Sequence, residues 1–365
     1  MNNLSKDLIT KYYSSKNENL ATKKLYFDVY NKMYYDLSFK TLNLIIKHYT
    51  ISWLLKSLLK NKLNFIQGKY FKKVTIPKTG NYIIISNTKN VLVFDLNKEI
   101  VTKLIFSKDN FEKRLAAFLY VEKTVDKVKS SLPDNHFPTI YEIESDKKNE
   151  IIAEISTLSP SINHISINEW PQALEVLSND LYFYYKHSDI KFENIEEHWI
   201  NLKDRITYLD DINLMTNLLN TFDEIIKEKK YLMFKCLVHS DFSRFNVVKG
   251  LKGYTLIDFS GAVRKNLFYD LYIQERWKPT SEFWLNIDNE KDIPIETSFN
   301  WLKSFVEKNE SDLNYKFENS EIKFYFFLSL LEQLERNNKM FSTLKHPIIK
   351  ILKLKKINND KNILI

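Results

Sequence analysis

Three polar side chains stand at fixed spacing between apolar runs in the second half of the chain. Asp241 and Asn246 lie within positions 237–248, and Asp258 ends the next apolar run, twelve residues after the asparagine. A loop between two strands would project Asp241 and Asn246 into a cleft, and the next strand would bring Asp258 beside them. Phosphoryl transfer needs a carboxylate to orient the attacking hydroxyl and oxygen ligands for Mg²⁺. The spacing therefore indicates phosphoryl-transfer chemistry.

The same motifs resemble those of the aminoglycoside phosphotransferase and choline kinase group of the protein-kinase-like fold. The segment His239-Ser-Asp-Phe-Ser-Arg-Phe-Asn246 is similar to the His-Gly-Asp-x4-Asn loop of that group. Leu256-Ile-Asp-Phe-Ser-Gly261 is similar to its metal-binding Asp segment, and Leu267-Phe-Tyr-Asp-Leu271 to the Pro-x-Tyr-Asp-Leu element that often follows. The resemblance extends coarsely from about residue 80 to residue 340.

This resemblance implies a role for each residue of the motifs. Asp241 is expected to be the catalytic base, Asn246 a Mg²⁺ ligand and Asp258 the principal Mg²⁺ ligand. His239 is expected to brace the loop through hydrogen bonds, and Asp270 to fix it from below. Asp and Asn also favour simple turns, but their register between apolar runs favours function. The implied cofactors are ATP and Mg²⁺.

Lys103 is the upstream residue expected to act on the nucleotide. It lies on the third of three predicted strands and matches the strand lysine that contacts the α- and β-phosphates and pairs with a helix glutamate. A helix is predicted to start near position 107 or 109. It offers Glu112 as the preferred partner of the lysine and Glu122 as the alternative.

A polar turn at positions 86–90 is expected to cover the phosphates. The hydroxyls of Ser86 or Thr88 could donate hydrogen bonds, but the turn lacks the glycine that normally permits close backbone approach to phosphate. Arg244 stands where related loops often carry Pro. Two readings of it stay open, the binding of an anion or a surface ion pair.

The elements that must position these residues fall into three regions. Residues 1–75 are expected to form a basic helical N-terminal extension, residues 76–158 a small antiparallel-sheet N-lobe, and residues 159–365 a larger helical C-lobe. The predicted class is α+β, a two-lobed protein-kinase-like fold. The expected N-lobe strands are Tyr82–Ser86, Val91–Phe94, Ile100–Phe106, Thr139–Ile143 and Ile151–Ile155. Backbone groups from Glu154 to Ser156, near the junction of the lobes, are expected to bind the adenine edge.

The basic charge of the chain is concentrated in residues 1–75. These hold 14 Lys, no Arg and 4 acidic residues, a net charge of +10, and the remainder holds 40 basic and 42 acidic residues. A nucleic-acid binder would carry basic charge on its body too, so no nucleic-acid partner is expected. The amphipathic helix predicted over Lys40–Phe65 leaves three readings open: packing on the kinase domain, contact with an anionic membrane surface, or binding of a partner.

Composition limits the remaining classes. The chain is 44% hydrophobic and 27% charged, which is typical of a globular protein with a core. The single Cys236 excludes an internal disulfide framework and is expected in the core. The start shows no secretory signal, and no apolar run approaches the ~18 residues that span a bilayer. A cytoplasmic protein is expected, with peripheral contact at the inner face of the membrane as an option.

The sequence thus predicts a kinase that moves the γ-phosphate of ATP to a hydroxyl of a small molecule or saccharide, with a cell-surface glycan precursor as one candidate. Two alternatives stay open. A degenerate kinase fold acting as a binding or scaffold protein is favoured by the glycine-free turn and opposed by the retained lysine, base and metal ligands. A protein kinase is disfavoured because no Ala-Pro-Glu segment or activation loop follows Asp258.

Overall fold

The computed structural model describes residues 3–28, 33–49, 55, 71–86, 90–108, 110–159, 164–206, 212–229, 231–250, 253–270, 300–318 and parts of 321–332. The chain separates into two compact units, which are described one at a time. Unit 1 comprises Met1–Ile167 and Phe245–Ser260, and unit 2 comprises Asn168–Arg244 and Gly261–Ile365. Both units combine helices with antiparallel strands, so the predicted α+β class is confirmed.

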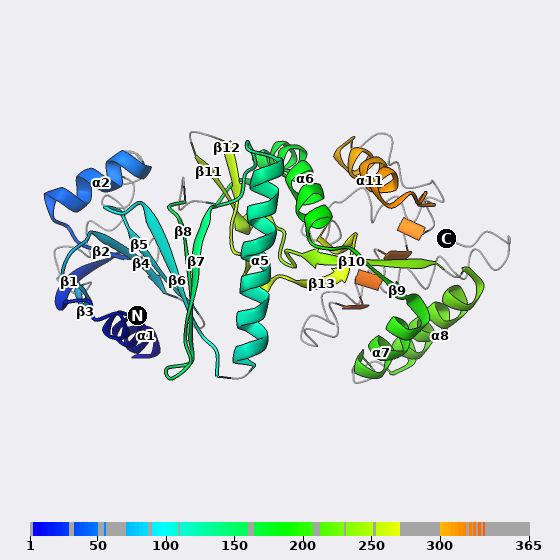
Figure 1. The fold of residues 1–365 in the computed structure, drawn as a ribbon, viewed down its shortest axis with the longest axis horizontal. Coiled ribbons are helices and arrows are strands. Elements are labelled where there is room, and N and C mark those ends of the chain that lie inside the picture. Colours follow the sequence, from blue (N-terminus) through cyan, green and yellow to red (C-terminus); the bar gives the residue numbers. More distant parts are fainter. Residues whose placement is uncertain are drawn as a thin grey trace. The chain divides into compact units, whose positions relative to one another are not determined.

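Unit 1 is built on an eight-stranded sheet in the order β3-β1-β2-β4-β5-β6-β8-β7, with antiparallel pairing throughout (Figure 1). The strands are β1 (Leu20–Asp28), β2 (Met33–Tyr35), β3 (Phe71–Pro77), β4 (Tyr82–Ser86), β5 (Asn90–Asp95), β6 (Ile100–Phe106), β7 (Ile140–Asp146) and β8 (Ile151–Thr157). A separate hairpin of β11 (Val247–Gly250) and β12 (Gly253–Leu256) belongs to the same unit. The five strands predicted for the N-lobe are thereby confirmed.

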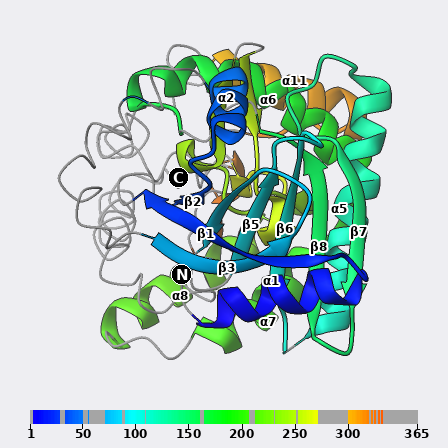
Figure 2. The same ribbon diagram turned by 90° about the vertical axis from the view of Figure 1, so that its left-hand side faces the viewer.

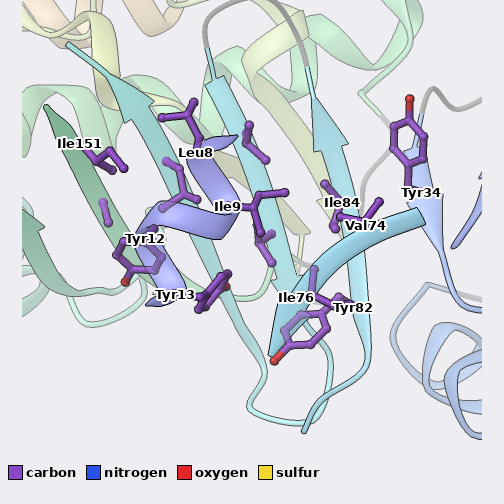
Figure 3. Close-up of a cluster of buried hydrophobic side chains, with 14 of the residues drawn as sticks. Leu8, Ile9, Tyr12, Tyr13, Tyr34, Val74, Ile76, Tyr82, Ile84 and Ile151 are labelled. Carbon is purple, nitrogen blue, oxygen red and sulfur yellow. The ribbon is translucent and has the colours of Figure 1, made fainter. Parts of the chain in front are cut away.

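Helices cover both faces of this sheet because successive side chains of a strand point to opposite faces. Leu104 packs with Ile9 of α1 (Asn3–Ser15), which lies against one face (Figures 2 and 3). Ile105 and Ile152 pack instead with Phe118 of α5 (Phe111–Ser131). Residues of α2 (Phe39–Tyr49) join a third cluster that includes inward-facing residues of β4, β5 and β6. Side chains at the odd positions of β6 therefore point away from α1.

The prediction of a helical N-terminal extension is correct for α1 and α2 and wrong for β1, β2 and β3. These strands extend the sheet, since β2 pairs with β4 and β1 joins β2 to β3. In β1, Leu25 packs in the cluster on the α1 face and Tyr26 in the cluster on the other face. The apolar part of β1, residues 25–27, is a short run, and periodicity alone cannot tell such a run from a helical segment.

The amphipathic helix predicted over Lys40–Phe65 is present as α2, over Phe39–Tyr49. The Oγ of Ser38 accepts the backbone N–H of Thr41, the side-chain cap expected at the start of a helix. Apart from Leu55, which is helical, residues 50–65 lie outside the described residues. The three readings of this segment therefore stay predictions.

Unit 2 is mainly helical, as the sequence predicts. Its helices are α6 (Trp170–His187), α7 (Ile195–Ile206), α8 (Ile212–Lys229) and α11 (Asn300–Leu313), and its small sheet has the order β13-β10-β9, with β9 (Lys191–Asn194), β10 (Leu232–Val238) and β13 (Val263–Asn266). Pro171 lies in the first turn of α6, where its missing N–H removes no bond within the helix. Cys236 is fully buried in β10, which confirms its predicted core role. None of the helices in the described part of the chain is both long and apolar enough to cross a bilayer.

The N-terminal extension should contribute to the stability of unit 1 as a layer of its fold. We expect Ile9→Ala to lower the free energy of unfolding by about 2–5 kcal/mol, because Ile9 is fully buried against the sheet and its loss leaves a cavity. Lys11→Ala on the exposed side of the same helix should change it by less than about 0.5 kcal/mol. Denaturant unfolding of both variants measures this, and equal stabilities would show that α1 is only loosely attached.

Candidate active site

Lys103 points into unit 1 from the middle of β6. The register sets it opposite Leu92 of β5 and Glu154 of β8. It shares the face of β6 that carries Val101 and Ile105, away from α1. The lysine side chain is only 6% exposed. The sheet therefore holds an ammonium group inside the fold, where a charge needs a partner.

The β11–β12 hairpin places Asn246 and Asp258 together at the end opposite its turn. Asn246 directly precedes β11, and Asp258 follows β12 by two residues. Val247 pairs with Leu256, and the backbone N–H of Ile257 donates to the carbonyl oxygen of Asn246 at 2.8 Å. The antiparallel ladder thus makes neighbours of two side chains that are twelve residues apart in sequence.

Asp258 is the partner that the structure gives to Lys103. The two side chains form an ion pair through the Nζ of the lysine and the Oδ1 of the aspartate. The same Oδ1 accepts a hydrogen bond from the Oγ of Ser260 at 2.5 Å. Asp258 has a φ of +66°, which is uncommon for a residue other than glycine and clusters at functional sites. Its side chain remains 42% exposed, so it can still bind a ligand.

These groups line a cavity of about 210 Å³ that lies within unit 1. Apolar side chains form its walls: Ile85, Leu92, Phe94 and Val101 from the sheet, and Val248 and Ile257 from the region of the hairpin. Its polar lining includes Lys103, Glu154, Asn246 and Asp258. Apolar walls with a few convergent polar groups are the usual form of a small-molecule site.

The donor set fits a nucleotide with a hard divalent cation. A carboxylate and an amide oxygen, from Asp258 and Asn246, are the ligand types that Mg²⁺ accepts. Lys103 is a cation of the kind that binds phosphate. The apolar walls offer surfaces for a planar base. The described residues therefore hold a group for each part of a metal–nucleotide complex.

The predicted adenine-binding residues Glu154 and Ser156 both lie on β8. This strand lies between β6 and β7, and both Glu154 and Ser156 are paired in the ladders on either side. The expectation that they bind the adenine edge stays a prediction. Ser156 lines the cavity, as does Ser159 just beyond the end of β8. The carboxyl group of Glu154 also lines it, and burial raises its pKa above the ordinary range.

The preference for Glu112 as the partner of Lys103 is corrected. Glu112 lies in the exposed first turn of α5 and forms an ion pair with Lys147 on the β7–β8 turn, at 2.6 Å. Glu122 is half-buried further along α5, and burial raises its pKa. Helix position alone did not separate these carboxylates, because the direction of each side chain depends on how α5 packs on the sheet.

The turn expected over the phosphates is described only in part. Ser86 is the last residue of β4, and Asn90, the first residue of β5, lines the cavity. Thr88 lies outside the described residues. The roles of Ser86 and Thr88 therefore stay predictions, as do both readings of Arg244, which is half-buried in a short turn before Asn246.

In unit 2, the loop that carries Asp241 is held by Asp270. The buried Asp270 carboxylate accepts the backbone N–H groups of His239 at 2.6 Å and Ser240 at 2.7 Å, and the hydroxyl of Tyr185 at 2.7 Å. Burial raises the pKa of Asp270, and these donors oppose that shift. The predicted support of the loop by Asp270 is thus confirmed. Tyr185, from α6, was missed because nothing in its local sequence links it to a loop 55 residues later.

The loop itself has an unusual backbone. Ser240, at the position of glycine in the resembled motif, has a φ of +67°. Its Oγ donates to the carbonyl oxygen of Gly261, and the Nδ1 of His239 accepts the backbone N–H of Asp241 at 3.3 Å. The expected bracing by His239 is confirmed. The Asp241 side chain is exposed at the end of this fixed turn.

A family model described as the RIO domain matches residues 198–267. No curated protein sequence matches the chain. Among solved structures, the chain is similar to the amicoumacin kinase hAmiN in complex with AMP-PNP, Ca²⁺ and Ami, with 13% identity, a TM-score of 0.47, and coverage of 77% of this chain and 88% of that one.

Aminoglycoside phosphotransferases are similar too. The GDP complex of wild-type aminoglycoside 2'-phosphotransferase-IIIa shares 14% identity, with a TM-score of 0.43 and coverage of 75% of this chain and 91% of that one. An aminoglycoside phosphotransferase from Streptomyces rimosus shares 12% identity, with a TM-score of 0.36 and coverage of 68% and 92%.

Asp270 should be more important for the loop than any one of its donors. We expect Asp270→Asn to lower the free energy of unfolding by about 1–3 kcal/mol, because the amide keeps one acceptor oxygen and its NH₂ leaves the backbone N–H of either His239 or Ser240 without an acceptor. Tyr185→Phe removes one donor and should cost less. Denaturant unfolding compares the two, and wild-type stability of Asp270→Asn would contradict this role.

Proposed function

We propose that this protein is a phosphotransferase that uses ATP and a divalent cation to phosphorylate a hydroxyl group of a small molecule. The observation that carries the proposal is the ion pair between Lys103 and Asp258 in a cavity that Asn246 also lines. A lysine for phosphates and two oxygen ligands for a cation are the groups that phosphoryl transfer requires, because its catalysis is mainly positioning and charge stabilisation.

The cavity supports the choice of a nucleotide as phosphate donor. A base would pack between apolar side chains of the sheet, such as Leu92 and Val101, and those near the hairpin, such as Val248 and Ile257. The phosphates would then meet Lys103. Bound Mg²⁺ would neutralise the charge that develops on the phosphates. Asp258 and Asn246 are the residues that would hold it.

Asp241 is the group we assign to the acceptor. Its side chain is exposed, and the buried Asp270 fixes the loop that carries it. A carboxylate on a rigid turn can orient a hydroxyl group and accept its proton. This role follows from the resemblance of the loop and from the way the loop is held.

The acceptor class is a hydroxyl-bearing small molecule. Aminoglycosides and amicoumacin are named with the similar structures, so both belong in a first panel of acceptors. Monosaccharides, amino alcohols and saccharide precursors of cell-surface glycans complete the panel. Release of ADP with each acceptor, against a blank without acceptor, identifies the substrate.

Two variants should separate chemistry from nucleotide binding. We expect Asp241→Asn to reduce turnover by about 10²–10⁴-fold, the usual contribution of a general base, with nearly unchanged affinity for Mg²⁺–ATP. Asp258→Asn should instead abolish the Mg²⁺-dependent part of nucleotide binding, because it removes the anionic oxygen. Titration calorimetry and steady-state kinetics on the same preparations measure both effects.

Two results would oppose this function. If millimolar Mg²⁺–ATP fails to raise the unfolding temperature, the folded protein does not bind nucleotide, and a scaffold role is favoured. If Asp241→Asn turns over the best acceptor as fast as the wild type, the assignment of the base is wrong.

A further inference from the structure

Glu154 is a buried acid to which the proposed function assigns no partner. Its residue is 8% exposed, and its Oε2 has no hydrogen-bond partner among the residues that the structure describes. It lies directly across from Lys103 in the β6–β8 ladder, on the same face of the sheet. Side chains opposite each other in antiparallel strands have Cβ atoms about 4.5–5.5 Å apart. The ladder thus sets a buried carboxyl group beside a buried ammonium group.

The ion-pair partner of Lys103 is also the residue that would bind the cation. In the structure its ammonium group pairs with Asp258. In the proposed function Asp258 is the principal cation ligand, and a carboxylate that binds a divalent cation loses most of its attraction for a lysine. The lysine side chain, at 6% exposure, cannot turn to bulk water for compensation.

The other acids near Lys103 are less suited to take over. Glu112 is 68% exposed and pairs with Lys147. Burial raises the pKa of Glu154, Lys103 lowers it, and repulsion from Asp258 and Glu122 raises it further. Among these three glutamates, Glu154 is the one that lines the cavity.

We propose that Glu154 is the positioning residue for Lys103, and that Lys103 exchanges Asp258 for Glu154 when the cation–nucleotide complex binds. This inference rests on the proposed function. Before binding, the Lys103–Asp258 pair holds the cation ligand in place and leaves Glu154 unsatisfied. After binding, the Lys103–Glu154 pair holds the ammonium group toward the phosphates. Glu154, on strand β8, therefore takes the role of ion-pair partner that the sequence analysis assigned to a glutamate of helix α5.

The exchange predicts that Glu154 acts on affinity only when the cation is present. We expect Glu154→Gln to weaken the binding of Mg²⁺–AMP-PNP about tenfold, within the range of coupling between contacting residues. The affinity for AMP-PNP with the metal chelated should change little, because Lys103 then keeps Asp258. Glu154→Asp should restore part of the loss. Titration calorimetry measures these affinities.

Three further variants make the test specific. Glu142→Gln, the same change on an exposed position of the neighbouring strand β7, should bind as the wild type does. Glu122→Gln tests the competing acid and should also leave the affinity unchanged. In a Lys103→Met background, Glu154→Gln should have no further effect, since the residue acts through the lysine.

Thermal unfolding without ligand separates positioning from a structural role. Glu154→Gln should unfold at or above the wild-type temperature, because it removes a buried carboxylate whose charged form is disfavoured. A lower unfolding temperature with unchanged Mg²⁺–AMP-PNP affinity would show a structural residue and overturn the inference alone. Loss of affinity in Glu122→Gln and not in Glu154→Gln would also overturn it. A wild-type protein that binds no Mg²⁺–AMP-PNP would overturn the inference together with the proposed function.

Discussion

A buried ammonium group must have a carboxylate beside it, and the centre of unit 1 is organised around that need. Lys103 comes from the interior of the sheet, and its partner Asp258 comes from a hairpin 155 residues later. The ion pair joins the two parts that form the walls of the cavity. Breaking one member of such a pair leaves an uncompensated buried charge, which is strongly destabilising. A ligand that breaks this ion pair must therefore be accompanied by another charge that compensates each separated partner.

Unit 2 also holds a buried charge that needs compensation, and there the charge is negative. Asp270 is a buried anion, and backbone N–H groups of the loop after β10 supply its compensation, together with Tyr185. These bonds hold Ser240 in a left-handed conformation that a residue with a Cβ rarely adopts. Such strain persists only where the surroundings over-determine it. Each unit thus uses one buried charge to fix a segment that carries polar, exposed side chains.

The N-terminal extension has a structural role that its charge does not indicate. Three strands between residues 20 and 77 enlarge the sheet, and α1 covers the face opposite to the one that carries Lys103. Among the described lysines of this region most are exposed, such as Lys72 and Lys73 on the edge strand β3. Charged side chains on an edge strand discourage pairing with another chain. In the described part of the extension, basic charge is therefore compatible with a purely architectural function.

The sequence by itself determined the motif residues Asp241, Asn246 and Asp258, the strand that carries Lys103 and the order of the central strands. It could do so because turns, short apolar runs and fixed spacings are local properties of the chain. Only the tertiary structure decided which carboxylate meets the lysine. That choice depends on the register of β6 against β8 and on the packing of α5, which bring together residues far apart in sequence. The buried position of Glu154 is a result of that register.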